Sequence, residues 1–260
     1  MNFQSVQKKN RDTLRTVSSF IDEKDYQSSP DNYGLPQHVS HLIDLPLNND
    51  LTYVDLVMFL QTQLGVSNPK YVEIGVSVLK TFYQVAHFLD NAELYAFDIN
   101  NINPTIAKKF ELTSEEGQIS QYTCGKNKIS YFKGDVFSRE DLENFKNYVG
   151  SKVNIIFSDA HHTGRGIASE YANYINDALA DEFILYYDDL ENDSMRHIFL
   201  EICEDIKKKR PNATSAFVKA NGWLGQHEHT HLNGIITSLD LESIIRKNRI
   251  PVPISFIRNM

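Results

Sequence analysis

Short apolar runs alternate with longer amphipathic segments from residue 52 onward. Five of these runs have the length and composition of buried strands: Tyr71–Ile74, Glu93–Phe97, Ile129–Phe132, Val153–Phe157 and Phe183–Tyr187. Between them, apolar residues recur three and four positions apart, as in the stripe of Val78, Phe82, Val85, Ala86 and Leu89. Strand–helix alternation of this kind predicts a parallel sheet with helices on both faces.

Two further strand-like runs follow Pro211 with no helical pattern between them: Thr214–Lys219 and Leu232–Ser238. Such a pair favours antiparallel pairing at the end of the sheet. The predicted fold class is therefore α/β, with a Rossmann-like, mostly parallel seven-stranded sheet, helices on both faces and a final antiparallel strand.

The first 50 residues differ in character from the rest of the chain. They are polar and interrupted by turn-forming residues, with one helix expected over about Gln4–Glu23. This segment is either an arm or cap on the main domain or a partly ordered extension. We expect the main domain over residues 51–240 and a C-terminal tail over residues 241–260, in which Ile250–Ile254 reads as extended chain.

Composition and charge narrow the class of protein. The 260 residues are enough for one full core, and no apolar run reaches the roughly 18 residues of a membrane span. The formal net charge of −8 makes nucleic acid an unlikely partner. Cys124 and Cys203 lie far apart, which predicts free thiols in a reducing compartment. Without an apolar secretory segment at the N-terminus, a cytoplasmic location is expected.

Glycine and acidic residues follow the predicted strands, where an open parallel sheet binds its ligands. Gly75 follows the first strand and permits a tight turn close to a ligand. Asp98 ends the second strand, at the distance from the glycine turn where an acid holds a ribose diol. The third, fourth and fifth strands are followed by Asp135, by Asp159 with His161 and His162, and by Asp188 with Asp189.

This set of residues resembles the class I S-adenosylmethionine-dependent methyltransferases over roughly residues 52–240. The first motif of that family, acidic–x–Gly–x–(Gly/Ser), matches Glu73, Gly75 and Ser77. Its ribose-binding acid matches Asp98, and its adenine-side acid matches Asp135. The resemblance implies that these residues bind S-adenosylmethionine. The chain departs from the family in having one glycine where many members have two or three, and it lacks the G-x-G-x-x-G pattern of a dinucleotide site.

A closer resemblance is to metal-dependent small-molecule O-methyltransferases of the catechol and macrolide-sugar types. These carry an acid after the fourth strand and an acidic pair after the fifth, matched here by Asp159 and by Asp188 with Asp189. The macrolide-sugar type has an Asp-x-x-His motif whose histidine acts as base, which implies His162 as general base; His161 is the alternative.

The implied metal site is chemically coherent. Three carboxylates at one sheet edge repel each other unless a cation joins them, and Mg²⁺ prefers such oxygen ligands. Each acid also fits a purely structural role. Asp98 and one of Asp188 and Asp189 fit helix caps, and Asp159 fits a turn.

Three histidines at alternate positions, His227, His229 and His231, form a further candidate group. They point to one side of an extended segment. They either bind a metal such as Zn²⁺ or form a polar loop at the substrate cleft.

The leading hypothesis is Mg²⁺-assisted O-methylation of a small polar acceptor, such as a sugar or diol. The alternatives are a metal-independent N- or O-methyltransferase with a histidine base, and a non-catalytic binding protein on the same fold. A homo-oligomer is compatible with the sequence.

Overall fold

A computed structural model describes residues 1–18, 43–44, 51–150, 152–222, 224 and 231–258. Its centre is one sheet of ten strands in the order β10-β8-β9-β7-β6-β1-β2-β5-β4-β3. The strands are β1 (Lys70–Ile74), β2 (Glu93–Asp98), β3 (Glu111–Glu116), β4 (Ile119–Cys124), β5 (Asn127–Lys133), β6 (Val153–Ser158), β7 (Leu179–Tyr187), β8 (Thr214–Ala220), β9 (His231–Thr237) and β10 (Ile254–Phe256). All seven predicted strands are present.

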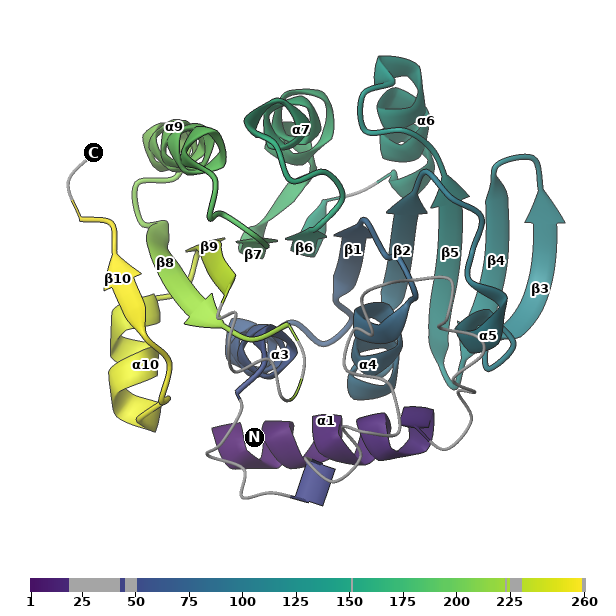
Figure 1. Ribbon diagram of the computed structural model, residues 1–260, viewed down its shortest axis with the longest axis horizontal. Coiled ribbons are helices and arrows are strands. Elements are labelled where there is room, and N and C mark those ends of the chain that lie inside the picture. The colour runs from purple at the N-terminus through teal and green to yellow at the C-terminus, as the bar shows by residue number, and fades with distance from the viewer. Residues whose placement is uncertain (19–42, 45–50, 151, 223, 225–230, 259–260) are drawn as a thin grey trace.

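Helices cover both faces of the sheet (Figure 1). One face carries α6 (Arg139–Val149), α7 (Gly164–Glu170) and α9 (Asp193–Lys209), and the other carries α3 (Tyr53–Leu64) and α4 (Lys80–Phe88). The remaining helices are α1 (Phe3–Ser18), α5 (Pro104–Ala107), the π-helix η2 (Tyr171–Ile175), α8 (Asn176–Ala178) and α10 (Leu241–Asn248).

The central strands are mostly apolar because both of their faces are buried. Along β1, Tyr71 belongs to the core beneath α3 and α4, whereas Val72 and Ile74 belong to the core beneath α6, α7 and α9. Strands β5, β2, β1, β6 and β7 pair in parallel. Their carboxyl ends therefore meet at one edge of the sheet.

The expectation of a seven-stranded, mostly parallel sheet with one final antiparallel strand was wrong. The sheet has ten strands and is mixed, because β3, β4, β8, β9 and β10 all form antiparallel pairs. The hairpin β3–β4 extends the sheet beyond β5. All residues of β3 are exposed, so the strand carries no buried face from which a sequence pattern would arise. At the other edge, β10 pairs with β8.

The N-terminal helix packs on the helices that cover the sheet, and the C-terminal segment adds a strand to it. Helix α1 lies outside α3 and α4 (Figure 1), and Val6 on α1 is fully buried in the same core. The predicted helix over Gln4–Glu23 is observed over Phe3–Ser18, and residues 19–23 lie outside the described part. Residues 241–258 contain α10 and β10. The division of the chain at residues 50 and 240 stays a prediction.

Two sequence expectations concern the whole chain. Cys124 and Cys203 are free cysteines. Among the described residues, no helix combines the length and the apolar character needed to cross a lipid bilayer.

Candidate functional site

A cavity of about 490 Å³ lies at the carboxyl ends of the parallel strands. Nine of the ten predicted site residues line it: Gly75, Ser77, Asp98, Asp135, Asp159, His161, His162, Asp188 and Asp189. Glu73 is the exception; it is buried, does not line the cavity, and accepts a hydrogen bond of 2.6 Å from the Tyr71 hydroxyl. The loops after five neighbouring strands thus meet at a single hollow, as ligand binding at a parallel sheet edge requires.

The turn after β1 is tight because another loop lies directly against it. Gly75 has φ +85°, and a Cβ atom at this position would lie 2.3 Å from the carbonyl oxygen of Asp159 and 2.4 Å from Cα of Ala160. Ser77 and Leu79 also have positive φ values, +43° and +66°. The turn therefore has three backbone positions in the left-handed region that favours glycine, and only the first of them is a glycine.

The carboxylate of Asp98 holds this turn in place. One oxygen, Oδ2, accepts the backbone N–H groups of Val76 at 2.9 Å and Ser77 at 3.0 Å. The other, Oδ1, accepts the backbone N–H of Asn100 at 2.8 Å. Asp98 borders the cavity, so a ribose hydroxyl at this wall would share oxygen atoms that already accept backbone N–H groups.

Two exposed apolar side chains at the same cavity were not identified from the sequence. Ile99 is 60% exposed and Phe137 is 39% exposed, and both line the cavity. The Phe137 ring lies 4.8 Å from the His161 ring and 5.2 Å from the Arg165 guanidinium carbon. Such exposed side chains at a cavity offer flat apolar contact for a ring-shaped ligand. The sequence signal that identifies them is their place just after strand-end acids: Ile99 directly follows Asp98, and Phe137 stands two residues after Asp135.

A chain of acidic and histidine side chains crosses the other half of the cavity. His162 Nε2 lies 3.2 Å from Asp159 Oδ1, and His162 Nδ1 lies 2.7 Å from Asp189 Oδ2. The second Asp189 oxygen contacts Nδ1 of His231, the first residue of β9. The hydrogen bond to Asp159 raises the pKa of His162, whereas burial lowers the pKa of His231.

Asp188 is the buried acid of this group. It is 7% exposed, and its Oδ1 atom has no hydrogen-bond partner among the described residues. Burial, together with the charge of Asp159, raises the pKa of Asp188 well above its usual range. Ligand atoms of Asp188, Asp189 and His231 lie within 4.8 Å of one another, so this trio is able to hold a metal ion. The sequence-derived trio has Asp159 in place of His231 and stays a prediction.

Lys80 brings a positive charge to these acids. It is 5% exposed and donates a hydrogen bond of 2.7 Å to the carbonyl oxygen of Gly222. Burial lowers the pKa of its ammonium group to about 8, although the charges of Asp188, Asp159 and Glu73 oppose that change. Sequence reasoning passed over Lys80 because a lysine in an amphipathic helix is usually solvated.

Two of the three histidines at alternate positions, His227 and His229, lie outside the described residues. Only His231 of that group is described, and it lines the cavity. The proposed alternation of the three side chains therefore stays a prediction.

No family model matches the sequence, and no curated protein does. Solved structures do match. An O-methyltransferase from Bacillus cereus in complex with SAH is similar with a TM-score of 0.54 and 10% identity, over 87% of this chain and 90% of that one. A putative O-methyltransferase from Klebsiella pneumoniae is similar with a TM-score of 0.50 and 12% identity, over 86% of this chain and 89% of that one. The chain therefore shares the α/β fold of these two structures. The resemblance seen in the sequence is thus confirmed for the fold.

Proposed function

We propose that this protein is an S-adenosylmethionine-dependent methyltransferase that modifies an oxygen atom of a small polar acceptor, sugar- or diol-like. One observation carries the proposal: a single cavity brings the turn after β1, Asp98 and Asp135 together with the acids and histidines after β6 and β7. Its volume of about 490 Å³ is in the range of small-molecule sites. The turn after β1, Asp98 and Asp135 suit the binding of a nucleoside. The acids and histidines after β6 and β7 suit proton transfer.

In this proposal Gly75, Ser77, Asp98 and Asp135 contact the cofactor. Glu73 is buried outside the cavity lining and does not touch it. Ile99 and Phe137 add apolar surface for the adenine ring. When bound, S-adenosylmethionine supplies a methyl group on a positively charged sulfur. The chain's own contribution is to hold the acceptor oxygen in line with that methyl group and to exclude water. SAH, present in the Bacillus cereus structure, is the product such a transfer leaves.

His162 is the proposed general base. Both of its ring nitrogens contact carboxylates, Nε2 that of Asp159 and Nδ1 that of Asp189. To act as base, the ring would release Asp189 and accept the proton of the acceptor hydroxyl on Nδ1, while the carboxylate of Asp159 stabilises the resulting charge. His161 fits the role less well because its Nδ1 hydrogen-bonds the hydroxyl of Thr163, not a carboxylate, and its ring packs against Phe137. Asp159 would orient the base.

A divalent cation at Asp159, Asp188 and Asp189, with Mg²⁺ as the sequence-based expectation, is the proposed aid to the reaction. The unpartnered Oδ1 of Asp188 fits a cation, since a buried carboxylate oxygen without a partner is otherwise costly. Such an ion lowers the pKa of a bound hydroxyl.

The links from His162 to two acids, together with the charge of Lys80, favour a second candidate, methyl transfer without a metal. Activity in excess chelator would support this candidate, whereas loss of activity with recovery on Mg²⁺ would support the first.

Calorimetric titration with S-adenosylmethionine tests the proposal most directly. We expect micromolar binding to the wild-type protein, loss of binding in Asp98→Ala and weaker binding in Asp135→Ala. Asp181→Ala is the matched control, because its side chain is 92% exposed and lies outside the cavity. No binding to the folded wild-type protein would overturn the proposal and favour a non-catalytic binding protein.

A further inference from the structure

We infer that Asp188, Asp189 and His231 form a mixed carboxylate–imidazole site that selects a first-row transition ion, such as Mn²⁺, Co²⁺ or Zn²⁺, over Mg²⁺. This inference rests on the proposed function for the role of the cavity, but it replaces Asp159 with His231 among the ligands and Mg²⁺ with a transition ion. The binding itself can be measured without methyl transfer.

The three side chains converge from two segments that are adjacent in the sheet. Asp188 and Asp189 follow β7, and His231 opens the antiparallel neighbour β9. Their ligand atoms lie within 4.8 Å of one another. Ligand atoms that share one ion at about 2.1 Å are separated by at most about 4.2 Å. Asp189 and His231 already contact each other directly, so an ion would enter as that contact opens and Asp188 moves toward it.

Asp188 is the observation that points to a ligand. A carboxylate that is 93% buried normally has a partner for each oxygen, yet Oδ1 of Asp188 has none among the described residues. Leaving a buried charged acceptor unpaired costs about 1–3 kcal/mol or more. A cation between Asp188 and its two neighbours supplies the missing partner and offsets the negative charge of both acids.

A buried amide holds the other two ligands in position. Asn233 is fully buried; its Oδ1 accepts the backbone N–H of Asp189 at 3.3 Å, and its Nδ2 donates to the carbonyl oxygen of His231 at 3.1 Å. Asp189 has φ +56°, a conformation that aspartate adopts more readily than most residues. This conformation directs its carboxylate between His162 and His231.

The imidazole is what changes the choice of ion. Mg²⁺ prefers six oxygen ligands and dehydrates reluctantly, so a nitrogen ligand adds little to its binding. Mn²⁺, Co²⁺ and Zn²⁺ accept imidazole together with carboxylate, with affinities that rise toward the end of the first row. A purely carboxylate site would not make this distinction as strongly.

The test is titration of the chelator-treated full-length protein with Co²⁺ and with Mg²⁺, followed by calorimetry and by the visible absorption of Co²⁺. We expect Co²⁺ to bind at least about 10-fold more tightly than Mg²⁺. His231→Gln should weaken Co²⁺ binding at least about 10-fold and shift the absorption, while Mg²⁺ affinity changes less than about 3-fold. Asp189→Asn, which suits the same backbone conformation, should weaken both ions.

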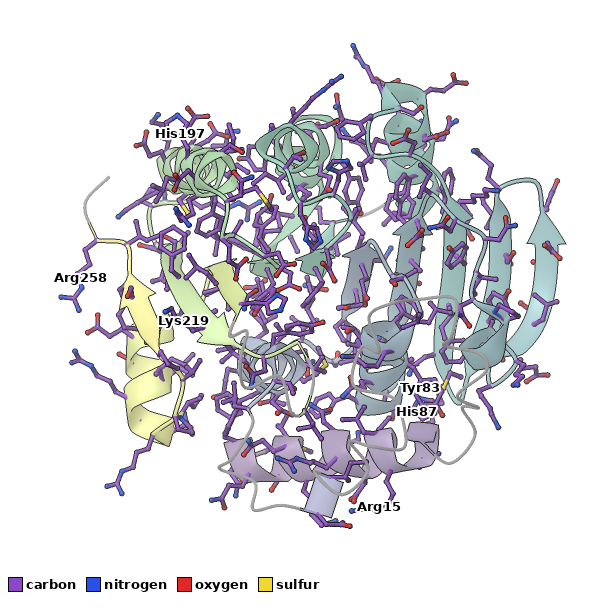
Figure 2. All side chains as sticks on the ribbon, in the orientation of Figure 1. Arg15, Tyr83, His87, His197, Lys219 and Arg258 are labelled. Atoms are coloured by element: carbon purple, nitrogen blue, oxygen red, sulfur yellow. The ribbon has the colours of Figure 1, made fainter. Side chains whose placement is uncertain are left out.

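His197→Gln is the matched control and should leave both affinities unchanged. His197 projects from the outer side of α9 (Figure 2), and its side chain is 73% exposed. Equal affinity for the two ions, unchanged Co²⁺ binding in His231→Gln or no saturable Co²⁺ binding would each overturn the inference. If His231→Gln fails to fold, the wild-type Co²⁺/Mg²⁺ ratio and the effect of Asp189→Asn decide.

Titration with S-adenosylmethionine in excess chelator separates the two ideas. Cofactor binding without Co²⁺ binding defeats the metal site alone, and Co²⁺ binding without cofactor binding defeats the methyltransferase alone.

Discussion

Glu170 is a buried acid that should make stability depend on pH. It is the last residue of α7, immediately before the π-helix, and it is fully buried. Its Oε2 accepts a hydrogen bond of 2.5 Å from the hydroxyl of Ser158, the residue before Asp159. Burial raises the pKa of Glu170 from 4.5 to about 8, so the folded protein holds this side chain neutral at pH 7.

The perturbation is Glu170→Gln, which replaces the neutral acid with an amide of the same shape. In the wild-type protein the folded-state pKa lies above the unfolded value. The stabilisation from Glu170 is therefore fully present below pH 4.5 and is lost as the pH rises through about 8. Each pH unit in this window corresponds to about 1.4 kcal/mol. Between about pH 5 and pH 8, the wild-type protein should lose roughly 3–4 kcal/mol relative to the variant.

Urea unfolding of both proteins at several pH values measures this difference, because other titrating groups affect both proteins equally. Ser158→Ala is the control. It removes the hydrogen bond but keeps the acid, so its stability should fall with pH at least as steeply as that of the wild type. A difference between wild type and Glu170→Gln that is constant from about pH 5 to pH 8 would refute the reasoning.

Three further predictions concern the free energy of unfolding, measured in urea titrations. Gly75→Ala should destabilise by roughly 3 kcal/mol or more, because its Cβ meets the backbone of the neighbouring loop; Gly125→Ala, with φ +60° but open space, should cost only about 1–2 kcal/mol. Equal effects would contradict the clash. Asn127→Ala should cost about 2–4 kcal/mol, since this buried amide makes three hydrogen bonds to backbone groups; a loss below about 1 kcal/mol would contradict this. Thr52→Ala should cost about 1 kcal/mol through loss of the capping box of α3, and no change would show that the cap contributes nothing.

The central part of the fold was predictable because burial on both faces leaves a clear record in the sequence. The runs that became β1, β2, β5, β6 and β7 are mostly apolar, and the helices between them carry apolar stripes. The hairpin β3–β4 left no such record. Its outer strand, which includes Glu111 and Glu116, is exposed on every residue and is held by backbone pairing to β4. Backbone pairing does not depend on side-chain identity, so the sequence carries little trace of it.

The site was predictable where a residue follows its strand directly. Asp98, Asp159 and Asp188 were identified because chain order fixes their place at the sheet edge. Lys80 does not line the cavity, and its approach to the acids depends on how α4 packs against the sheet. His231 was a candidate from the sequence, but its contact with Asp189 depends on how β9 lies beside β7. A single sequence does not encode that arrangement as a local pattern.

The residues that match the methyltransferase motif best are also those on which the loops depend. Gly75 admits the loop after β6, and both oxygens of Asp98 accept backbone N–H groups from neighbouring loop residues. Loss of cofactor binding on replacing either residue would therefore combine a lost contact with a displaced loop. Phe137 separates the two effects, because its side chain is exposed at the cavity. Phe137→Ala should weaken cofactor binding while leaving the unfolding midpoint unchanged, whereas a purely structural role would lower the midpoint.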